Sequence, residues 1–193
     1  EKYQKNMRAY YRMISGVDHV IGRVLAALTD RGLVDNTVII YTGDNGYYMG
    51  DRGLAGKWSH YEQSLRVPLI ILDPRQPRAR RTRLVDAMAL NIDLTATMLD
   101  LARVPIPDHY QGRSLVPLIE GNLPADWRTD FFCEHLMNHP DIPKWEGVRG
   151  TRYTYARYFA QAPAYEFLHD LSTDPDQLVN LVDSPAHQAI LER

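Results

Sequence analysis

The sequence contains a single cysteine, Cys133, among its 193 residues. One thiol cannot form an internal disulfide, and a free cysteine in a globular protein usually behaves as a small buried apolar side chain. Long apolar runs are also lacking, since stretches such as residues 38–41 and 67–72 are far shorter than the roughly 20 residues that a membrane-spanning helix needs. The sequence therefore predicts neither a disulfide-stabilised domain nor a membrane span.

An excess of charge of either sign is absent as well. The 22 Lys and Arg residues nearly balance the 24 Asp and Glu residues, and the net charge is -2. Such a surface has no general attraction for nucleic acid or for an anionic membrane, so neither partner is expected. The chain opens at Glu1 without a starting Met or a signal sequence, which favours a fragment of a longer protein and leaves the compartment open.

The first half of the chain has the pattern of an α/β layer. Apolar residues recur at alternating steps of three and four between Met7 and Leu28, and Gly32 follows as a stop, which predicts an amphipathic helix. The β-branched run at 37–42 and the run at 67–72 predict strands buried on both faces. Alternating helices and strands indicate a mainly parallel sheet flanked by helices. Such sheets bind ligands at the carboxyl ends of their strands, which here points to the glycine-rich loop 43–56.

The composition changes after Val104. Prolines and glycines punctuate residues 105–124 in a linker-like stretch. Aromatic, partly alternating segments follow at 148–149, 153–159 and 166–171, and they predict a small antiparallel sheet. We therefore expect an α/β unit over residues 1–104 and a small antiparallel α+β subdomain over residues 105–193.

Asp44 and Asn45 stand between two glycines, directly after the first predicted strand. Carboxylate and amide oxygens are hard ligands suited to Ca²⁺ or Mg²⁺, and the glycines let the backbone turn sharply toward an ion. Two side chains do not fill a shell of six to eight oxygens, so other ligands must come from elsewhere. A plain turn remains the alternative, because Asp, Asn and Gly are common turn residues.

Lys57 follows Gly56 at the end of the same loop, and His60 lies close behind it. A lysine on a glycine-rich loop can neutralise an oxyanion such as sulfate or phosphate, although a solvated surface lysine has the same local pattern. His60 could act as an acid, as a ligand or as a packed polar residue. Taken one at a time, these residues do not decide between a site and an ordinary loop.

Taken together, residues 42–46, 56–57, 61–62 and 66–70 resemble the second signature region of the sulfatase family, which belongs to the alkaline phosphatase superfamily. Residues 11–28, 91–97, 112–118, 147–149, 167–171, 174–175 and 180–181 resemble sulfatases too, so the resemblance covers nearly the whole chain in order. It implies a calcium-dependent sulfuric ester hydrolase that acts on sulfated glycans or aryl sulfates. On this view residues 1–104 are the C-terminal part of the catalytic α/β domain, and residues 105–193 are the small C-terminal subdomain.

The resemblance also implies roles for individual residues. Asp44 and Asn45 match a pair of calcium ligands, and Lys57 matches the lysine that contacts the sulfate group. His60, His135 and Arg149 are candidate substrate-binding residues, the last two because the C-terminal part of a sulfatase often leans over the rim of the active site. The family further implies a periplasmic, secreted or lysosomal location.

The family's nucleophile is absent from this sequence. Sulfatases use a formylglycine made from a Cys or Ser in a Cys/Ser-x-Pro/Ala-x-Arg motif, whereas Cys133 is followed by Glu134, His135 and Leu136. Two further acidic calcium ligands and a histidine that assists the leaving group also lie upstream in the family. We therefore expect an incomplete site for one Ca²⁺ ion, an inactive fragment, and an open sheet edge that could self-associate.

Two other readings stay open. A phosphodiesterase, phosphatase or phosphonate hydrolase of the same superfamily often holds two zinc ions, and a zinc site would more naturally place a histidine where Asn45 stands. That favours one hard ion but leaves a phosphonate or phosphodiester hydrolase with a sulfatase-type site possible. A non-catalytic binding module, with residues 44–57 as a structural turn, is the alternative from a different class.

Overall fold

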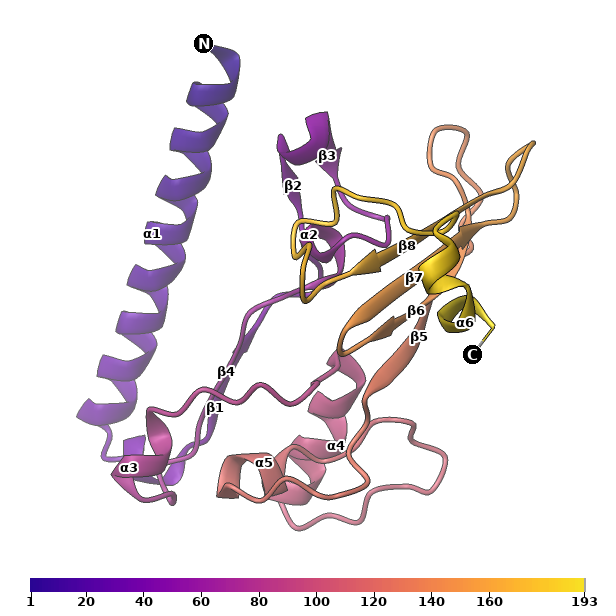
Figure 1. Cartoon of the computed structure of the whole chain (residues 1–193). Helices are drawn as coiled ribbons and strands as arrows, with labels where there is room; N and C mark the ends of the chain where they lie inside the picture. The colour runs from indigo at the N-terminus through magenta and orange to yellow at the C-terminus, as the bar shows by residue number, and fades with distance from the viewer. Residues whose placement is uncertain (193) are drawn as a thin grey trace.

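The computed structural model of the chain describes residues 1–192, apart from the side chain of Arg80, as a mixed helix and sheet structure (Figure 1). Helix α1 (Lys2–Asp30) stands to one side of the molecule, and Gly32, with a φ of 66°, follows its C-cap Arg31. The predicted helix and its glycine stop are therefore confirmed. Its apolar stripe is exposed, with Val17 and Val24 at 44% and 52% exposure, and none of its residues is buried.

Strands β1 (Ile39–Thr42) and β4 (Leu69–Leu72) form an antiparallel pair in which Thr42 lies opposite Leu69. The sequence predicts parallel pairing, and this pair differs because a parallel connection needs a crossover of a dozen or more residues, usually a helix. Helix α2 (Glu62–Leu65), the only α-helix between the two strands, has 4 residues. Tyr41 and Ile70 are 37% and 62% exposed, so this pair is not covered on both faces by the residues that the structure describes.

The segment between β1 and β4 carries most of the predicted site. It contains the short 3-10 helix η2 (Asp51–Gly53) between strands β2 (Tyr48–Met49) and β3 (Ala55–Gly56), which pair antiparallel. Another 3-10 turn, η1 (Val34–Asn36), precedes β1. This segment places the β2–β3 hairpin and α2 beyond one end of the β1–β4 pair (Figure 1).

Short helices connect the two halves of the chain: α3 (Arg78–Arg81), α4 (Asn91–Leu101) and α5 (Val116–Glu120). Buried Leu115, Leu118 and Trp127 pack against Leu69 and Ile71 of β4. Apolar burial of this kind is the main favourable contribution to folding. Residues beyond position 104 therefore help to hold the strand pair of the first half.

Asp93 forms the polar centre of the same region. Its carboxylate is fully buried and accepts hydrogen bonds from the backbone N–H groups of Leu90 at 2.7 Å and Arg113 at 2.8 Å. Both of its oxygens also accept from the guanidinium of Arg128. A buried carboxylate is tolerated only when it is paired and hydrogen-bonded in this way. Asp93 therefore joins the start of α4 to the chain that leads into the second sheet.

The predicted antiparallel sheet is confirmed as a meander of four strands, β5 (Asp130–His135), β6 (Trp145–Gly150), β7 (Tyr153–Tyr158) and β8 (Tyr165–Asp170). Its buried face contains Trp145, Ala156 and Tyr158, which pack against Leu65 of α2 and Phe167. The sheet thus lies directly against the segment that carries Lys57. The chain ends in η3 (Pro185–His187) and α6 (Gln188–Leu191).

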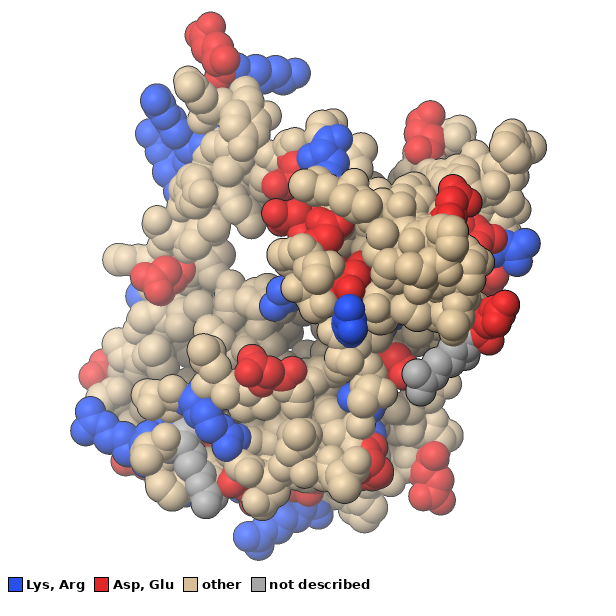
Figure 2. Space-filling model, in the orientation of Figure 1, with Lys and Arg blue, Asp and Glu red and all other residues tan. Residues whose placement is uncertain are grey.

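The helices in the described part of the chain are all too short or too polar to cross a membrane. Figure 2 shows Lys and Arg side chains interspersed with Asp and Glu over the visible face, as the balanced composition predicts.

Candidate functional site

The turn after β1 is fixed against helix α2. The N–H of Gly46 donates to the carbonyl oxygen of Ser64 at 3.0 Å. A Cβ atom on Gly46 would lie 2.2 Å from the carbonyl oxygen of Gln63, so only glycine fits this approach. Asn45 donates its own side-chain N–H to the carbonyl of Gly46 at 2.7 Å. These contacts fix the position of Asn45 against the backbone of α2.

Lys57 and Asn45 meet across this turn. The Lys57 ammonium donates a hydrogen bond to Oδ1 of Asn45, which confirms that these two predicted site residues share one place. Asp44 is exposed beside them, and its backbone carbonyl accepts from the side-chain amide of Asn91 at 3.1 Å. Gly56, with a φ of 90°, provides the backbone conformation that turns the chain into Lys57.

Lys57 also lines a cleft of about 360 Å³, called here the Lys57 cleft. Its walls are mainly aromatic, and they come from both halves of the chain: Tyr48, Trp58, Tyr61, Tyr158, Tyr165 and Phe167. Residues 141–143, in the loop between β5 and β6, close another side. Ligand pockets commonly combine such apolar walls with a few polar groups that fix orientation. The sequence predicts strands at the aromatic segments 153–159 and 166–171 and does not predict this lining.

His60 does not line the Lys57 cleft. Only 1% of its surface is exposed, and its ring stacks on Phe167 at a centroid distance of 4.8 Å. Burial, followed by the neighbouring His169 and Arg52, lowers the pKa of His60 to about 3, so the imidazole is neutral at pH 7. The structure therefore differs from the predicted substrate contact and matches the alternative of a packed polar residue.

The hydrogen bonds around His60 fix its tautomer. Nδ1 of His169 lies 2.9 Å from the carbonyl oxygen of Val179, which only accepts, so this nitrogen carries the proton of a neutral His169. Nε2 of His169 must then accept from Nε2–H of His60, 3.4 Å away. Nδ1 of His60 in turn accepts from the hydroxyl of Tyr158 at 2.9 Å. These hydrogen bonds connect the segment that carries Lys57 to strands β7 and β8. The sequence pattern does not predict this connection.

Arg149 is engaged by Glu62 of α2. Its Nε and Nη2 donate to the two carboxylate oxygens at 3.1 Å and 2.9 Å, and Nη1 donates to the carbonyl of Gly150 at 3.0 Å. Bidentate pairs of this kind are directional and strong. The guanidinium is therefore turned to α2 and not to the Lys57 cleft, so the structure gives Arg149 a bracing contact where the sequence predicts substrate binding.

His135 lies at the end of β5 and is half-buried. Its Nε2 is buried and has no hydrogen-bond partner among residues 1–192. Burial lowers the pKa of His135, and the nearby His139 lowers it further. His135 does not line the Lys57 cleft in this structure.

Cys133 behaves as the sequence predicts for a thiol without a catalytic role. It is half-buried, and its Sγ lies 3.7 Å from the carbonyl oxygen of Gly147. Burial, followed by the negative charge of Glu62, raises the pKa of the thiol to about 12. The thiolate, which is the nucleophilic form, is therefore scarce at neutral pH.

The oxygen donors at the turn suit a hard cation. Asn45 Oδ1 accepts a hydrogen bond from Lys57, and the preceding residue, Asp44, is exposed. Carboxylate and amide oxygens are typical ligands of Ca²⁺. In the described part of the chain, no three His, Cys, Asp or Glu side chains gather where they could hold a metal ion. At this turn the described residues thus present two oxygen-bearing side chains, Asp44 and Asn45, and not a complete coordination shell.

Comparison with known proteins identifies the family to which this chain belongs. The family of the N-sulphoglucosamine sulphohydrolase C-terminal region matches residues 50–193. An N-acetylglucosamine-6-O-sulfatase of Bacteroides thetaiotaomicron is 35% identical over 93% of this chain and 32% of its own length. An arylsulfatase of Clostridium perfringens is 34% identical over 93% of this chain and 36% of its own length. The chain thus spans about a third of these relatives.

Solved structures show the same fold. One, of a protein in complex with its substrate D-glucosamine-2-N,6-O-disulfate, superposes with a TM-score of 0.91 at 31% identity, over 99% of this chain and 39% of that one. A phosphonate monoester hydrolase of Agrobacterium radiobacter gives a TM-score of 0.82 at 31% identity, over 94% of this chain and 38% of that one. The predicted α/β fold of the alkaline phosphatase superfamily is confirmed. The chain belongs to the sulfatase family and corresponds to the C-terminal portion of its members.

Proposed function

We propose that this chain supplies part of the active site of a calcium-dependent sulfatase that hydrolyses sulfate esters on glycans. The observation that carries the proposal is that Lys57, which donates to Asn45, also lines an aromatic cleft. It places a permanent positive charge, an oxygen ligand for a cation and an apolar wall for a sugar ring in one place. The names of the relatives suggest a sulfated hexosamine as the substrate class.

Lys57 binds and neutralises the non-bridging oxygens of the sulfate group in this proposal. A charge fixed near those oxygens stabilises the transition state as negative charge builds on the leaving oxygen. Asp44 and Asn45 hold the cation, and Asn45 at the same time orients the Lys57 side chain. A bound Ca²⁺ would supply further positive charge to stabilise the sulfate group.

The nucleophile comes from outside this chain in this proposal. Cys133 is neutral at pH 7 and lies on the sheet, next to Gly147 and away from the Lys57 cleft. A formylglycine in a further part of the polypeptide, as in sulfatases generally, would complete the site together with the remaining calcium ligands. The chain by itself is then inactive. A location outside the cytoplasm accompanies the proposal, and one similar relative is an extracellular sulfatase homologue of Drosophila melanogaster.

A second candidate is the hydrolysis of phosphonate monoesters. Two phosphonate monoester hydrolases superpose with TM-scores of 0.82 and 0.80, at 31% and 33% identity. A lysine and a hard cation stabilise a phosphonate oxyanion by the same electrostatics that serve a sulfate ester. Because the same charges serve both reactions, rates on the two substrates separate the two candidates.

The test compares Lys57→Ala with Lys5→Ala, a control on exposed helix α1, in the full-length enzyme that contains this chain. We expect Lys57→Ala to lower kcat on 6-O-sulfated glucosamine by about 100-fold or more, because removing a donor that stabilises transition-state charge costs that much. The melting temperature should barely change, since Lys57 lines a cleft rather than the core. The control should match the parent enzyme.

Two outcomes would contradict this assignment. Normal turnover by Lys57→Ala would remove Lys57 from the site. A parent enzyme whose kcat/KM is higher on an aryl phosphonate monoester than on an aryl sulfate and on sulfated glucosamine would favour the second candidate over a sulfatase.

A further inference from the structure

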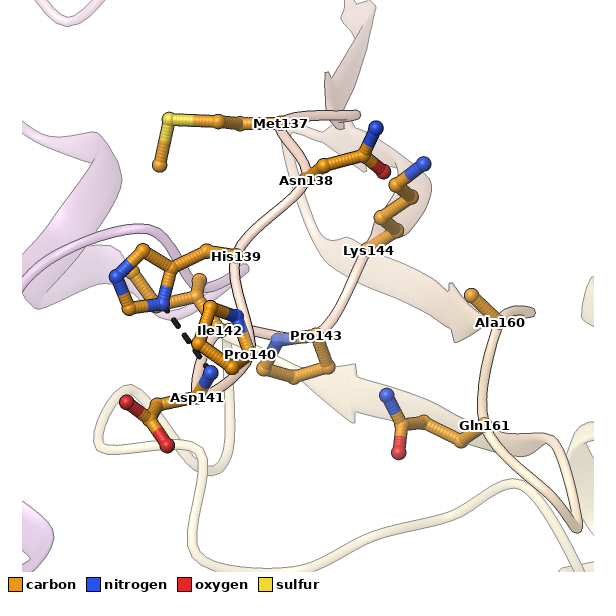
Figure 3. Close-up of a pocket in the computed structure, with 10 residues that line it drawn as sticks. All are labelled: Met137, Asn138, His139, Pro140, Asp141, Ile142, Pro143, Lys144, Ala160 and Gln161. Atoms are coloured by element: carbon orange, nitrogen blue, oxygen red, sulfur yellow. Dashed lines mark hydrogen bonds between the residues drawn. The ribbon is translucent and has the colours of Figure 1, made fainter.

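A second hollow, of about 510 Å³, lies at the loop end of the four-stranded sheet. It is lined by residues 137–144 of the loop between β5 and β6 and by Ala160 and Gln161 of the loop between β7 and β8 (Figure 3). Its volume falls within the roughly 300–1,000 Å³ of typical ligand pockets. None of the residues assigned above to the metal or sulfate site lines it.

One stretch of chain separates this hollow from the Lys57 cleft. Asp141, Ile142 and Pro143 line both spaces, so the loop between β5 and β6 is a partition with a ligand space on each side. A molecule that projects past this partition from the Lys57 cleft enters the second hollow. The two spaces are therefore arranged as neighbouring subsites for one extended ligand.

The partition is held in a fixed shape. His139 and Ile142 form a β-bridge, and Pro140 and Pro143 restrict the backbone beside it. The N–H of Asp141 donates to Nδ1 of His139 at 3.1 Å, drawn as a dashed line in Figure 3. Because Nδ1 accepts, the neutral imidazole carries its proton on Nε2, where it can donate to a ligand. A wall fixed in this way binds a ligand without the cost of ordering a loop.

The polar groups around the hollow suit a sugar that carries one negative charge. Lys144 is half-buried, and Figure 3 shows its ammonium beside the amide of Asn138. Within residues 1–192 Lys144 makes no hydrogen bond or ion pair that would satisfy its charge. Gln161 points toward the loop from the opposite hairpin, which adds an amide for a hydroxyl group. Asp141 is the single acidic residue in the lining and Lys144 the single basic one. The attraction for an anion therefore comes from the Lys144 ammonium itself and not from a net positive charge of the lining.

We propose that this hollow is a subsite for the sugar unit next to the sulfated one, and that Lys144 binds a carboxylate or sulfate on that unit. The inference rests on the proposed function, because it assumes that the sulfated sugar occupies the Lys57 cleft. It narrows the substrate from a sulfated monosaccharide to an anionic oligosaccharide. Ile142 and Pro143 offer apolar contact to the sugar ring as it passes the partition.

The experiment uses the full-length enzyme with Lys144→Ala, the conservative variant Lys144→Arg, and Lys5→Ala as a control. The probes are an aryl sulfate, 6-O-sulfated glucosamine, and disaccharides in which that sugar is linked to a uronic acid, a sulfated hexose or a neutral hexose. Affinity is measured by calorimetry and kcat/KM by sulfate release. Calorimetry needs no turnover, so it tests the subsite even if the enzyme proves not to be a sulfatase.

Lys144→Ala should weaken binding of an anionic disaccharide by about 10-fold, the value of one charge-assisted hydrogen bond to a partly exposed group. Binding of the neutral disaccharide and turnover of the aryl sulfate should not change, and Lys144→Arg should restore most of the loss. The uronic acid and sulfated hexose arms show which anion the subsite prefers. Equal affinity of Lys144→Ala and the control for both anionic disaccharides would overturn the proposal, as would an equal loss on all probes.

Discussion

Lys57 and His60 belong to one short segment of the chain, yet they lie in opposite environments. Lys57 faces a cleft and contacts Asn45, whereas His60 is enclosed by Tyr158, Phe167 and His169. The sequence predicts the first of these positions through its glycine-rich loop. It does not predict the second, because the residues that enclose His60 come from strands about 100 positions away in the sequence, and His60 meets them only in the folded chain.

The pKa of His60 makes a prediction about stability and pH. An unfolded histidine has a pKa near 6.5, and burial lowers that of His60 to about 3. Below pH 6.5 the unfolded state therefore takes up a proton that the folded state refuses, and stability falls as the pH falls. Between pH 7 and pH 5 this one group should reduce the free energy of unfolding by about 2 kcal/mol.

Replacing His60 by Phe should remove that loss while leaving the aromatic stacking with Phe167. The variant should be less stable at pH 7, because Tyr158 and His169 lose a hydrogen-bond partner, but its stability should change less between pH 7 and pH 5. Urea unfolding at the two pH values measures both effects, with exposed His109→Ala as the control. A loss on acidification as large in His60→Phe as in the parent chain would show that His60 is not the titrating group.

At the scale of elements, helix α2 is short but central. It has 4 residues, and it positions the Asn45 turn through the contact of Gly46 with Ser64 and the second sheet through Leu65. An isolated helix of this length is not stable by itself in water. Its conformation must therefore come from tertiary contacts, among which the pair of Glu62 with Arg149 is the most directional.

Removing that pair should destabilise the fold measurably. Glu62 and Arg149 keep 13% and 21% of their side-chain surface exposed. Arg149→Ala therefore leaves a mostly buried carboxylate with only the longer contact to the exposed Arg66, at 3.8 Å. We expect a loss of about 1–3 kcal/mol in the free energy of unfolding. Arg157→Ala is the matched control on β7, because its pair with Glu166 spans 3.6 Å and is far more exposed. That variant should lose under about 1 kcal/mol, and denaturant titration of both should rank them in this order.

Helices and strands that have a local sequence pattern could be predicted. Strand pairings and contacts between residues far apart in the sequence could not. The period of the apolar residues gives α1, and the aromatic alternation gives the antiparallel sheet that contains β6, β7 and β8. The direction of β1 against β4 was misjudged, because runs such as residues 37–42 and 67–72 have no alternation that would reveal pairing or burial. The partition between the Lys57 cleft and the second hollow is likewise a tertiary feature, made by a proline-containing loop that has no motif of its own.

At the scale of the whole molecule, apolar surface remains open. Ile70 on β4 is 62% exposed, Met13 on α1 is 62% exposed and Phe132 on β5 is 61% exposed. Scattered exposed residues are normal, but an apolar helix stripe together with an exposed strand marks a surface suited to contact with more protein. Relatives about three times as long offer such additional protein, and self-association of the isolated chain stays a prediction.

The proposed calcium site gives the prediction that belongs to this scale. The chain provides the oxygens of Asp44 and Asn45, and one of these, Asn45 Oδ1, already bonds to Lys57. A Ca²⁺ ion prefers six to eight oxygens, and sites completed mainly by water bind it with a Kd of about 1 mM or weaker. Calorimetric titration of the 193-residue chain should therefore show at most millimolar affinity, and an aryl sulfate assay should show no turnover. The full-length enzyme should bind Ca²⁺ far more tightly and lose that affinity in Asp44→Ala. Micromolar Ca²⁺ binding or measurable turnover by the isolated chain would mean that its own residues complete the site. The proposal that further calcium ligands and the nucleophile come from another part of the polypeptide would then be wrong.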